Sequence, residues 1–276
     1  MSVDSQSVKI AFIGIGHMGF AILEGLVKSQ KVPANNILVF DMNETAVQKA
    51  LAMGCVRGSM DRADSNCVLN VPYLLYALRP QQSAEFLKAL PLTKEHCMIS
   101  VVGGWNIQQH RQHATECRIV RTMPNTPLAA GHGCTAIASD SPCTPEDLVV
   151  AKLVFGCSGV VLELPETKFD AVTVVSGCGP AYAFYVLDNM IKKGVELGLD
   201  EETAKKAACQ TLKGSAIMAA ESDQSTEALW RAVCSPGGIT EKAVKHFINQ
   251  DMGKTIGDGM QAAYDTSVNF SKGKLN

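Results

Sequence analysis

The chain has 276 residues, of which 46% are hydrophobic, and its formal net charge at pH 7 is −2. This length predicts two moderate domains, or one domain with a large appendage, and the apolar fraction suffices for a sizeable core. Basic and acidic residues are interspersed, which excludes the basic patches of nucleic-acid-binding proteins and the acidic runs of disordered tails.

Two features bear on the location of the protein. Residues 1–7 are polar and lack the basic and apolar regions of a signal peptide, so we expect a cytoplasmic protein. The most apolar stretch, residues 171–187, contains Gly177, Gly179 and Pro180 and is shorter than the run of about 20 apolar residues that a membrane span needs. We therefore expect a buried helix there and no membrane association.

Ten cysteines raise the question of a metal site or of disulfides. No two follow the C-x-x-C spacing, so we interpret them as reduced cysteines that act as small apolar residues. His110, His113 and Cys117 lie close together in sequence, and we interpret the histidines as part of an exposed polar helix face. The sequence therefore predicts no metal site.

Short apolar runs alternate with amphipathic stretches in the first half of the chain. This alternation predicts βαβ units and a largely parallel sheet. Strands are expected at residues 8–13, 37–40, 73–78, 98–102 and 119–123, with 135–139 as one further candidate. Helices are expected at residues 20–28, 45–52 and 82–90.

The pattern changes near residues 163–165, after which helical signals replace strand signals. Asp200 can cap the start of one helix. Helical stretches are expected at residues 204–220, 226–233, 239–249 and 256–268. We therefore predict an α/β domain over residues 1–164, followed by an all-helical domain over residues 165–276.

A Gly-x-Gly-x-x-Gly turn follows the first predicted strand and opens the first predicted helix. Gly14 permits the tight turn, Gly16 lets the backbone approach a pyrophosphate, and Gly19 lets the helix pack closely on the strand. The helix N-terminus then presents free N–H groups to phosphates. Dinucleotide binding is therefore predicted for Gly14, Ile15, Gly16, His17, Met18 and Gly19. A turn with a packing role alone is the alternative.

Asp41 ends the second predicted strand. A carboxylate at this position accepts hydrogen bonds from the adenine ribose and repels a 2′-phosphate, which taken alone favours NADH. Asn43 and Thr45 could nevertheless donate hydrogen bonds to a phosphate, and Asp41 could simply cap the turn into the following helix. The choice between NADH and NADPH therefore stays open.

A Pro-Gly-Gly break interrupts the helical half at residues 235–240. Ser235 can cap a helix, Pro236 suits a first turn, and the two glycines would expose backbone N–H groups. These features predict an anion site for a small carboxylate beside the hydroxyl of Thr240. An ordinary interhelical turn is the alternative.

In their order and spacing these motifs resemble those of the pyrroline-5-carboxylate reductase family, which catalyses the last step of proline synthesis. The resemblance covers almost the whole chain and is carried by the segments 14–19, 77–81, 121–127, 176–182 and 235–240. The chain departs from the family pattern at four positions. Cysteine replaces a hydroxyl residue at Cys178 and Cys234, arginine replaces lysine at Arg79, and Ile239 replaces a smaller residue.

The resemblance implies a Rossmann domain with a mostly parallel sheet, followed by an all-α C-terminal dimerisation domain. It also implies reduction of a cyclic imine to L-proline with NADPH or NADH, by homodimers that assemble further, for example into decamers. Substrate binding would fall on Ser235, Gly237, Gly238, Ile239 and Thr240, with Thr240 as the catalytic residue beside the ring nitrogen. Besides the glycine turn, cofactor binding would fall on Asp41, Asn43, Ala77, Leu78, Arg79, Pro80, Gly103, Met123 and Asn125.

Two other functions fit parts of the sequence. A β-hydroxyacid dehydrogenase also opens with a Gly-x-Gly-x-Met-Gly turn, but it needs a lysine on a helix as acid and base. Lys192 and Lys193 are the nearest candidates for that lysine. A non-catalytic dinucleotide-binding regulator would keep the glycine turn and would not need Thr240.

Overall fold

The structure, a computed structural model, describes residues 3–273, which form two compact units. The α/β unit comprises the chain up to Cys178 together with the residues from Tyr264 onward, and the helical unit comprises Gly179–Ala263. Among residues 3–273, no helix is both long enough and apolar enough to cross a membrane.

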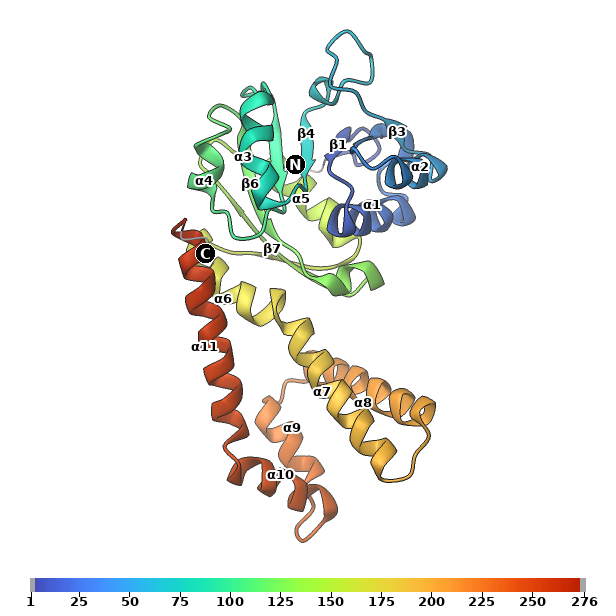
Figure 1. Cartoon of the computed structure of the whole chain (residues 1–276), viewed down its shortest axis with the longest axis vertical. Helices are drawn as coiled ribbons and strands as arrows, with labels where there is room; N and C mark the ends of the chain where they lie inside the picture. Colours follow the sequence, from blue (N-terminus) through green and yellow to red (C-terminus); the bar gives the residue numbers. More distant parts are fainter. Residues whose placement is uncertain (1–2, 274–276) are drawn as a thin grey trace. The chain divides into compact units, whose positions relative to one another are not determined.

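The α/β unit is built from alternating strands and helices (Figure 1). Its strands are β1 (Ile10–Ile13), β2 (Ile37–Phe40), β3 (Val56–Arg57), β4 (Tyr73–Tyr76), β5 (Cys97–Ser100), β6 (Arg118–Met123), β7 (Gly133–Ser139) and β8 (Gly159–Glu163). Its helices are α1 (His17–Ser29), α2 (Glu44–Ala52), α3 (Pro80–Ala89), α4 (Ile107–Arg111), α5 (Pro145–Gly156) and α6 (Phe169–Val172), which continues into a π-helical turn (Thr173–Gly177).

The strands form one sheet in the order β3-β2-β1-β4-β5-β6-β7-β8. All neighbouring strands are parallel except β6 and β7. The strand order reverses direction at β1, which pairs with both β2 and β4, so Ile13 lies opposite Phe40 and Tyr76. This is the strand order of a Rossmann fold, which places the ligand crevice at the carboxyl ends of the strands beside β1. The expected mostly parallel Rossmann architecture is confirmed.

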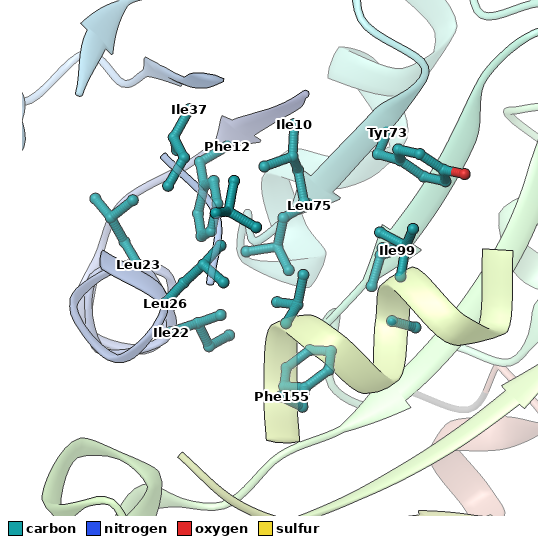
Figure 2. Packing of buried hydrophobic residues seen from close by; sticks show 14 of the residues in the cluster. Ile10, Phe12, Ile22, Leu23, Leu26, Ile37, Tyr73, Leu75, Ile99 and Phe155 are labelled. Carbon is teal, nitrogen blue, oxygen red and sulfur yellow. The ribbon is translucent and has the colours of Figure 1, made fainter. Parts of the chain in front are cut away.

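Helices cover both faces of the sheet, because successive side chains of a parallel strand point to opposite faces. On one face Ile10 and Phe12 of β1 pack against α1 and against Phe155 of α5 (Figure 2). On the other face Ala11 and Ile13 belong to a second buried cluster. Phe12 and Phe155 are almost fully buried, and burying a side chain of this size contributes roughly 1.5–3 kcal/mol.

The helical unit contains α7 (Gly179–Glu196), α8 (Glu201–Glu221), α9 (Thr226–Val233), α10 (Ile239–Asn249) and the first part of α11 (Met252–Ser271). Helix α7 packs against α8. Every residue of α7 is nevertheless at least partly exposed, including Phe184 at 61% and Tyr185 at 73%. The expectation of a buried helix over residues 171–187 is therefore wrong for the single chain, because too few helices surround α7 to cover its apolar side.

The compact units divide after Cys178, whereas the sequence suggested a boundary between residues 164 and 165. The intervening segment packs on the α/β unit, where Phe169 is buried against Ala136 and Ala138. The end of α11 also belongs to this unit, since the hydroxyls of Ser267 and Ser271 donate hydrogen bonds to Asp170.

Candidate active site

The glycine turn has the geometry that the sequence predicts. Gly14 adopts a φ of +88°, and a Cβ on it would lie 2.9 Å from the carbonyl oxygen of Ala77. A Cβ on Gly19 would lie 2.3 Å from the carbonyl oxygen of Gly14. The N–H of Gly14 donates to Phe40, and the N–H of Ala77 donates to Ile13. These contacts join the turn to the ends of β2 and β4.

Gly16 lies at the open side of the turn. No atom of the described chain lies within 4 Å of a Cβ built on it. Gly16 is the N-cap of α1, and within residues 3–273 no side chain caps this end of the helix. The first turn of α1 therefore offers N–H groups and the positive end of the helix dipole to an anion. This cradle fits the pyrophosphate of a dinucleotide.

Asp41 follows β2 and lies beside the same turn. Its Oδ2 accepts a hydrogen bond of 2.6 Å from the N–H of Ile15, and its Oδ1 accepts one of 2.7 Å from the N–H of Asn43. Asn43 in turn caps α2, because its side-chain oxygen accepts from the N–H of Ala46. The capping role considered for Asp41 therefore falls on Asn43, and Asp41 orders the glycine turn instead.

The segment after β4 completes this edge of the site. Leu78 lies against the turn, since its Cδ2 would be 2.8 Å from a Cβ on Gly14. Arg79 is the exposed N-cap of α3, and Pro80 occupies the first turn of that helix. The register of the parallel strands thus brings Ala77 and Leu78 next to the glycine turn.

The loop after β5 carries Gly103, which is exposed and has open space at its Cβ position within the described chain. A buried hydrogen-bond chain supports this loop. The Ser100 hydroxyl lies 2.7 Å from Nε2 of His110 and accepts a hydrogen bond from the N–H of Val102. Nδ1 of His110 lies 2.8 Å from the carbonyl oxygen of Asn106.

The expectation of an exposed histidine face is therefore wrong for His110, which is fully buried, while His113 is half-buried and Cys117 is fully buried. A tertiary contact explains this burial, because Ser100 at the end of β5 provides His110 with a polar partner inside the core. Sequence reasoning missed this chain of hydrogen bonds, since Ser100 and His110 come from different elements and no local pattern joins them.

Burial makes stability depend on the protonation of His110. Burial lowers the pKa of His110 from its ordinary 6.5 to about 4, and the nearby Arg121 adds to this effect. Between these values the unfolded chain binds a proton that the folded chain does not. The free energy of unfolding should therefore fall on acidification through this window, by up to roughly 3 kcal/mol.

Urea unfolding measured across this pH window tests the effect. The His110→Gln variant, which keeps a polar side chain without the titration, should show a shallower loss of stability on acidification. Equal slopes for the variant and the unmodified protein would contradict this role of His110.

Met123 and Asn125 lie at the end of β6 and contact the π-helical turn. The Cε of Met123 would be 2.7 Å from a Cβ on Gly177. The Asn125 amide nitrogen donates to the carbonyl oxygen of Ser176 at 3.0 Å, and its amide oxygen accepts from the N–H of Cys134 at 2.9 Å. The side chain of Asn125 thus clamps three segments together. A contact of this residue with the nicotinamide stays a prediction.

The loop between α9 and α10 belongs to the helical unit. Its glycine N–H groups are already used within the chain, since Gly237 donates to Oε2 of Glu241 at 2.9 Å and Gly238 donates to the carbonyl oxygen of Ser235 at 2.9 Å. The expectation of bare glycine N–H groups is therefore wrong. Lys245 and the Gly237 N–H hold the pKa of Glu241 below its usual range.

The first turn of α10 remains able to bind an anion. Gly238 is its N-cap and makes no side-chain cap hydrogen bond, while the Glu241 carboxylate takes up the N–H of Gly237 just before the helix. Thr240 is exposed at the second position of the helix, next to Ile239, which is 91% exposed. The loop therefore presents a hydroxyl and helix N–H groups on one surface.

Cys97, Cys143 and Asp147 bring potential metal-ligating atoms within 4.8 Å of one another. The Asp147 carboxylate is already occupied, because it accepts hydrogen bonds from Arg118 at 2.8 Å and from the N–H of Thr144 at 2.7 Å. Cys55, Cys67 and Cys117 are buried core residues, whereas Cys209 is exposed. Burial raises the pKa of Cys55 to about 11, which keeps its thiol protonated.

Comparisons with known proteins match two separate parts of the chain to two family profiles. A family profile described as pyrroline-5-carboxylate reductase dimerisation matches residues 166–270, and one described as NADP oxidoreductase, coenzyme F420-dependent, matches residues 9–104. The pyrroline-5-carboxylate reductase of Synechocystis sp. is 33% identical over 97% of this chain and 100% of its own length. That of Methanosarcina acetivorans is 34% identical over 95% of both chains.

Solved structures give the same result. A pyrroline-5-carboxylate reductase from Coxiella burnetii is 28% identical, with a TM-score of 0.85 over 96% of this chain and 99% of its own. The pyrroline carboxylate reductase of Plasmodium falciparum, solved with NADP bound, is 26% identical, with a TM-score of 0.81 over 96% of this chain and 98% of its own.

Proposed function

Because the chain belongs to the pyrroline-5-carboxylate reductase family, we propose that it reduces 1-pyrroline-5-carboxylate to L-proline. It is an oxidoreductase that uses NAD(P)H and acts on a C=N bond. The observation that carries the proposal is the presence in one chain of a site suited to a dinucleotide and of a second site suited to a small carboxylate. One is the glycine turn with open space at Gly16, and the other is the exposed Thr240 at the N-terminus of α10.

The proposed mechanism needs few side chains. The bound dinucleotide supplies a hydride, and the imine carbon accepts it readily once the ring nitrogen is protonated. The protein contributes proximity and orientation. The first turn of α10 holds the substrate carboxylate, and the Thr240 hydroxyl hydrogen-bonds at the ring nitrogen. Because a hydroxyl is a weak acid, Thr240 orients the nitrogen and does not serve as the source of its proton.

The structure favours this activity over that of a β-hydroxyacid dehydrogenase. A lysine that serves as general acid and base in that reaction needs a pKa lowered toward neutrality. Lys192 is exposed and its ammonium lies 2.6 Å from Asp188, which raises its pKa. Lys193 is also exposed and pairs with Glu196 at 2.7 Å. Neither lysine is placed as that chemistry requires.

We also propose that the helical unit forms a homodimer, that dimers assemble into decamers, and that the protein acts in the cytoplasm. Support for the dimer comes from the matching dimerisation profile and from an apolar cavity of about 920 Å³ in the helical unit, whose lining includes Tyr185, Phe247 and Ile256. In this arrangement the Ser235–Thr240 loop of one subunit supplies the substrate-binding part of an active site whose dinucleotide is held by its partner.

Two assays that follow the cofactor directly test the proposed reductase activity and the alternative dehydrogenase activity. Oxidation of NADH or NADPH should depend on added 1-pyrroline-5-carboxylate. Reduction of NAD⁺ or NADP⁺ by 3-hydroxyisobutyrate should be absent under the same conditions. The opposite pattern would support the dehydrogenase, and cofactor binding without turnover of either substrate would support a non-catalytic regulator. Sedimentation equilibrium of the same sample measures the assembly.

A further inference from the structure

Asp41 is held in place beside the glycine turn, where a Rossmann fold is expected to place the adenine ribose of a dinucleotide. Its two carboxylate oxygens are fixed by the main-chain N–H groups of Ile15 and Asn43, at 2.6 and 2.7 Å. Ile15 is buried, with 1% of its surface exposed. If the carboxylate swung away, it would leave this N–H without its partner, which is costly for a buried donor. The negative charge therefore stays beside the glycine turn.

The segment that follows Asp41 carries no cation that could bind a 2′-phosphate. The next residue, Met42, is neutral and 97% exposed. The chain has no lysine or arginine from Asp41 to Gln48. Arg57, on the neighbouring strand β3, is engaged by the carboxylate of Glu44 through two hydrogen bonds of 3.1 and 2.5 Å.

The donors that could favour a 2′-phosphate are weak. The side-chain oxygen of Asn43 caps α2, which fixes the orientation of its amide, and Thr45 offers a neutral hydroxyl in the first turn of that helix. Neither residue carries a positive charge that would offset the negative charge of the fixed Asp41 carboxylate. Coulomb repulsion between Asp41 and a doubly charged phosphate then determines the preference.

We propose that Asp41 makes this protein prefer NADH over NADPH, by accepting hydrogen bonds from the ribose hydroxyls and by repelling a 2′-phosphate. This inference rests on the dinucleotide use of the proposed function. The expected preference is on the order of 10- to 100-fold in dissociation constant, or about 1.4–2.8 kcal/mol, which lies between the values for one charge contact in water and near a protein surface.

Calorimetric titration of the whole protein with adenine nucleotides tests the preference without catalysis. The probes are 5′-AMP and adenosine 2′,5′-bisphosphate, followed by NADH and NADPH. The unmodified protein should bind the probe without the 2′-phosphate more tightly in each pair. The Asp41→Asn variant keeps the shape of the side chain but loses its charge, so the ratio should fall by about 10-fold.

Asp4→Asn is the matched control. Asp4 accepts a hydrogen bond from the N–H two residues later, as Asp41 does, and it lies in a segment bonded to the C-terminal end of α1. This variant should keep the original ratio. An Asp41→Asn variant that retains the full preference would overturn the inference.

The relative affinity of the unmodified protein for nucleotides with and without a 2′-phosphate tests the inference by itself. Equal or tighter binding of the 2′-phosphorylated probes would show that Asn43 and Thr45 receive the phosphate, and would overturn the inference even if the imine is reduced. A clear preference for the unphosphorylated probes without imine turnover would leave the inference standing and remove the proposed function. Absence of binding by all four probes would contradict both.

Discussion

Replacing Gly16 with alanine should weaken dinucleotide binding strongly and leave the fold almost unchanged. The added methyl group meets no atom of the described chain within 4 Å. It instead occupies the space through which the pyrophosphate approaches the backbone. The dissociation constant for NAD(P)H should rise by roughly 100-fold, a change equivalent to about 2.7 kcal/mol. Loss of stability should stay below about 1 kcal/mol, because alanine is only a poorer N-cap than glycine.

Two other glycines provide controls for Gly16→Ala. Gly19→Ala forces a methyl group to within 2.3 Å of the carbonyl oxygen of Gly14, so it should lower the free energy of unfolding by about 1–3 kcal/mol or more. Gly214→Ala, in α8, meets open space in the described chain as Gly16 does, and it should leave nucleotide binding intact. Tight NAD(P)H binding by Gly16→Ala would contradict the assignment of the turn.

Replacing Thr240 with alanine should lower kcat for imine reduction by roughly 10- to 100-fold, as expected for the loss of one positioned hydrogen bond. Thr240 is exposed in the first turn of α10, so its truncation should not affect stability. Affinity for NADH and NADPH should also remain unchanged, since the glycine turn belongs to the α/β unit. Steady-state kinetics combined with nucleotide titration separates these effects.

The conservative variant Thr240→Ser keeps the hydroxyl and should recover most of the lost rate. Such recovery distinguishes a hydrogen bond at the ring nitrogen from a packing contact of the threonine methyl group. An unchanged kcat in Thr240→Ala, or an equal loss in Thr240→Ser, would contradict the role given to this hydroxyl.

Local sequence patterns predicted the elements that carry the dinucleotide site. Strand β2 has the bounds expected from its apolar run. The glycine turn has the predicted conformation, since Gly14 adopts a positive φ and Gly19 packs against the carbonyl oxygen of Gly14. Helix α5 and strand β8 were missed. The buried residues Val150, Ala151, Val154 and Phe155 of α5 share one face. Leu148, Val149 and Leu153 are apolar on its other sides, so the sequence shows no clear helical period. Strand β8 is defined by pairing with β7, a non-local contact.

The Ser235–Thr240 loop shows which details local sequence patterns do not predict. The turn at Ser235–Gly238 was expected, and the start of α10 at Ile239 agrees with it. The hydrogen bond from Gly237 to Glu241 was not foreseen, although a carboxylate four residues after a glycine can reach back to cap a helix start. His110 was placed on the surface because its partner Ser100 lies on another element. In both places a side chain from outside the motif decides which polar groups remain free.

Isotope transfer tests the central claim most directly. The protein is incubated with 1-pyrroline-5-carboxylate and with NADH or NADPH that carries deuterium at one of the two C4 positions of the nicotinamide, and the product is analysed by mass spectrometry. We predict L-proline that has gained one deuterium at the ring carbon of the former C=N bond, from only one of the two labelled positions. The absence of proline, or proline without deuterium from either position, would contradict the account.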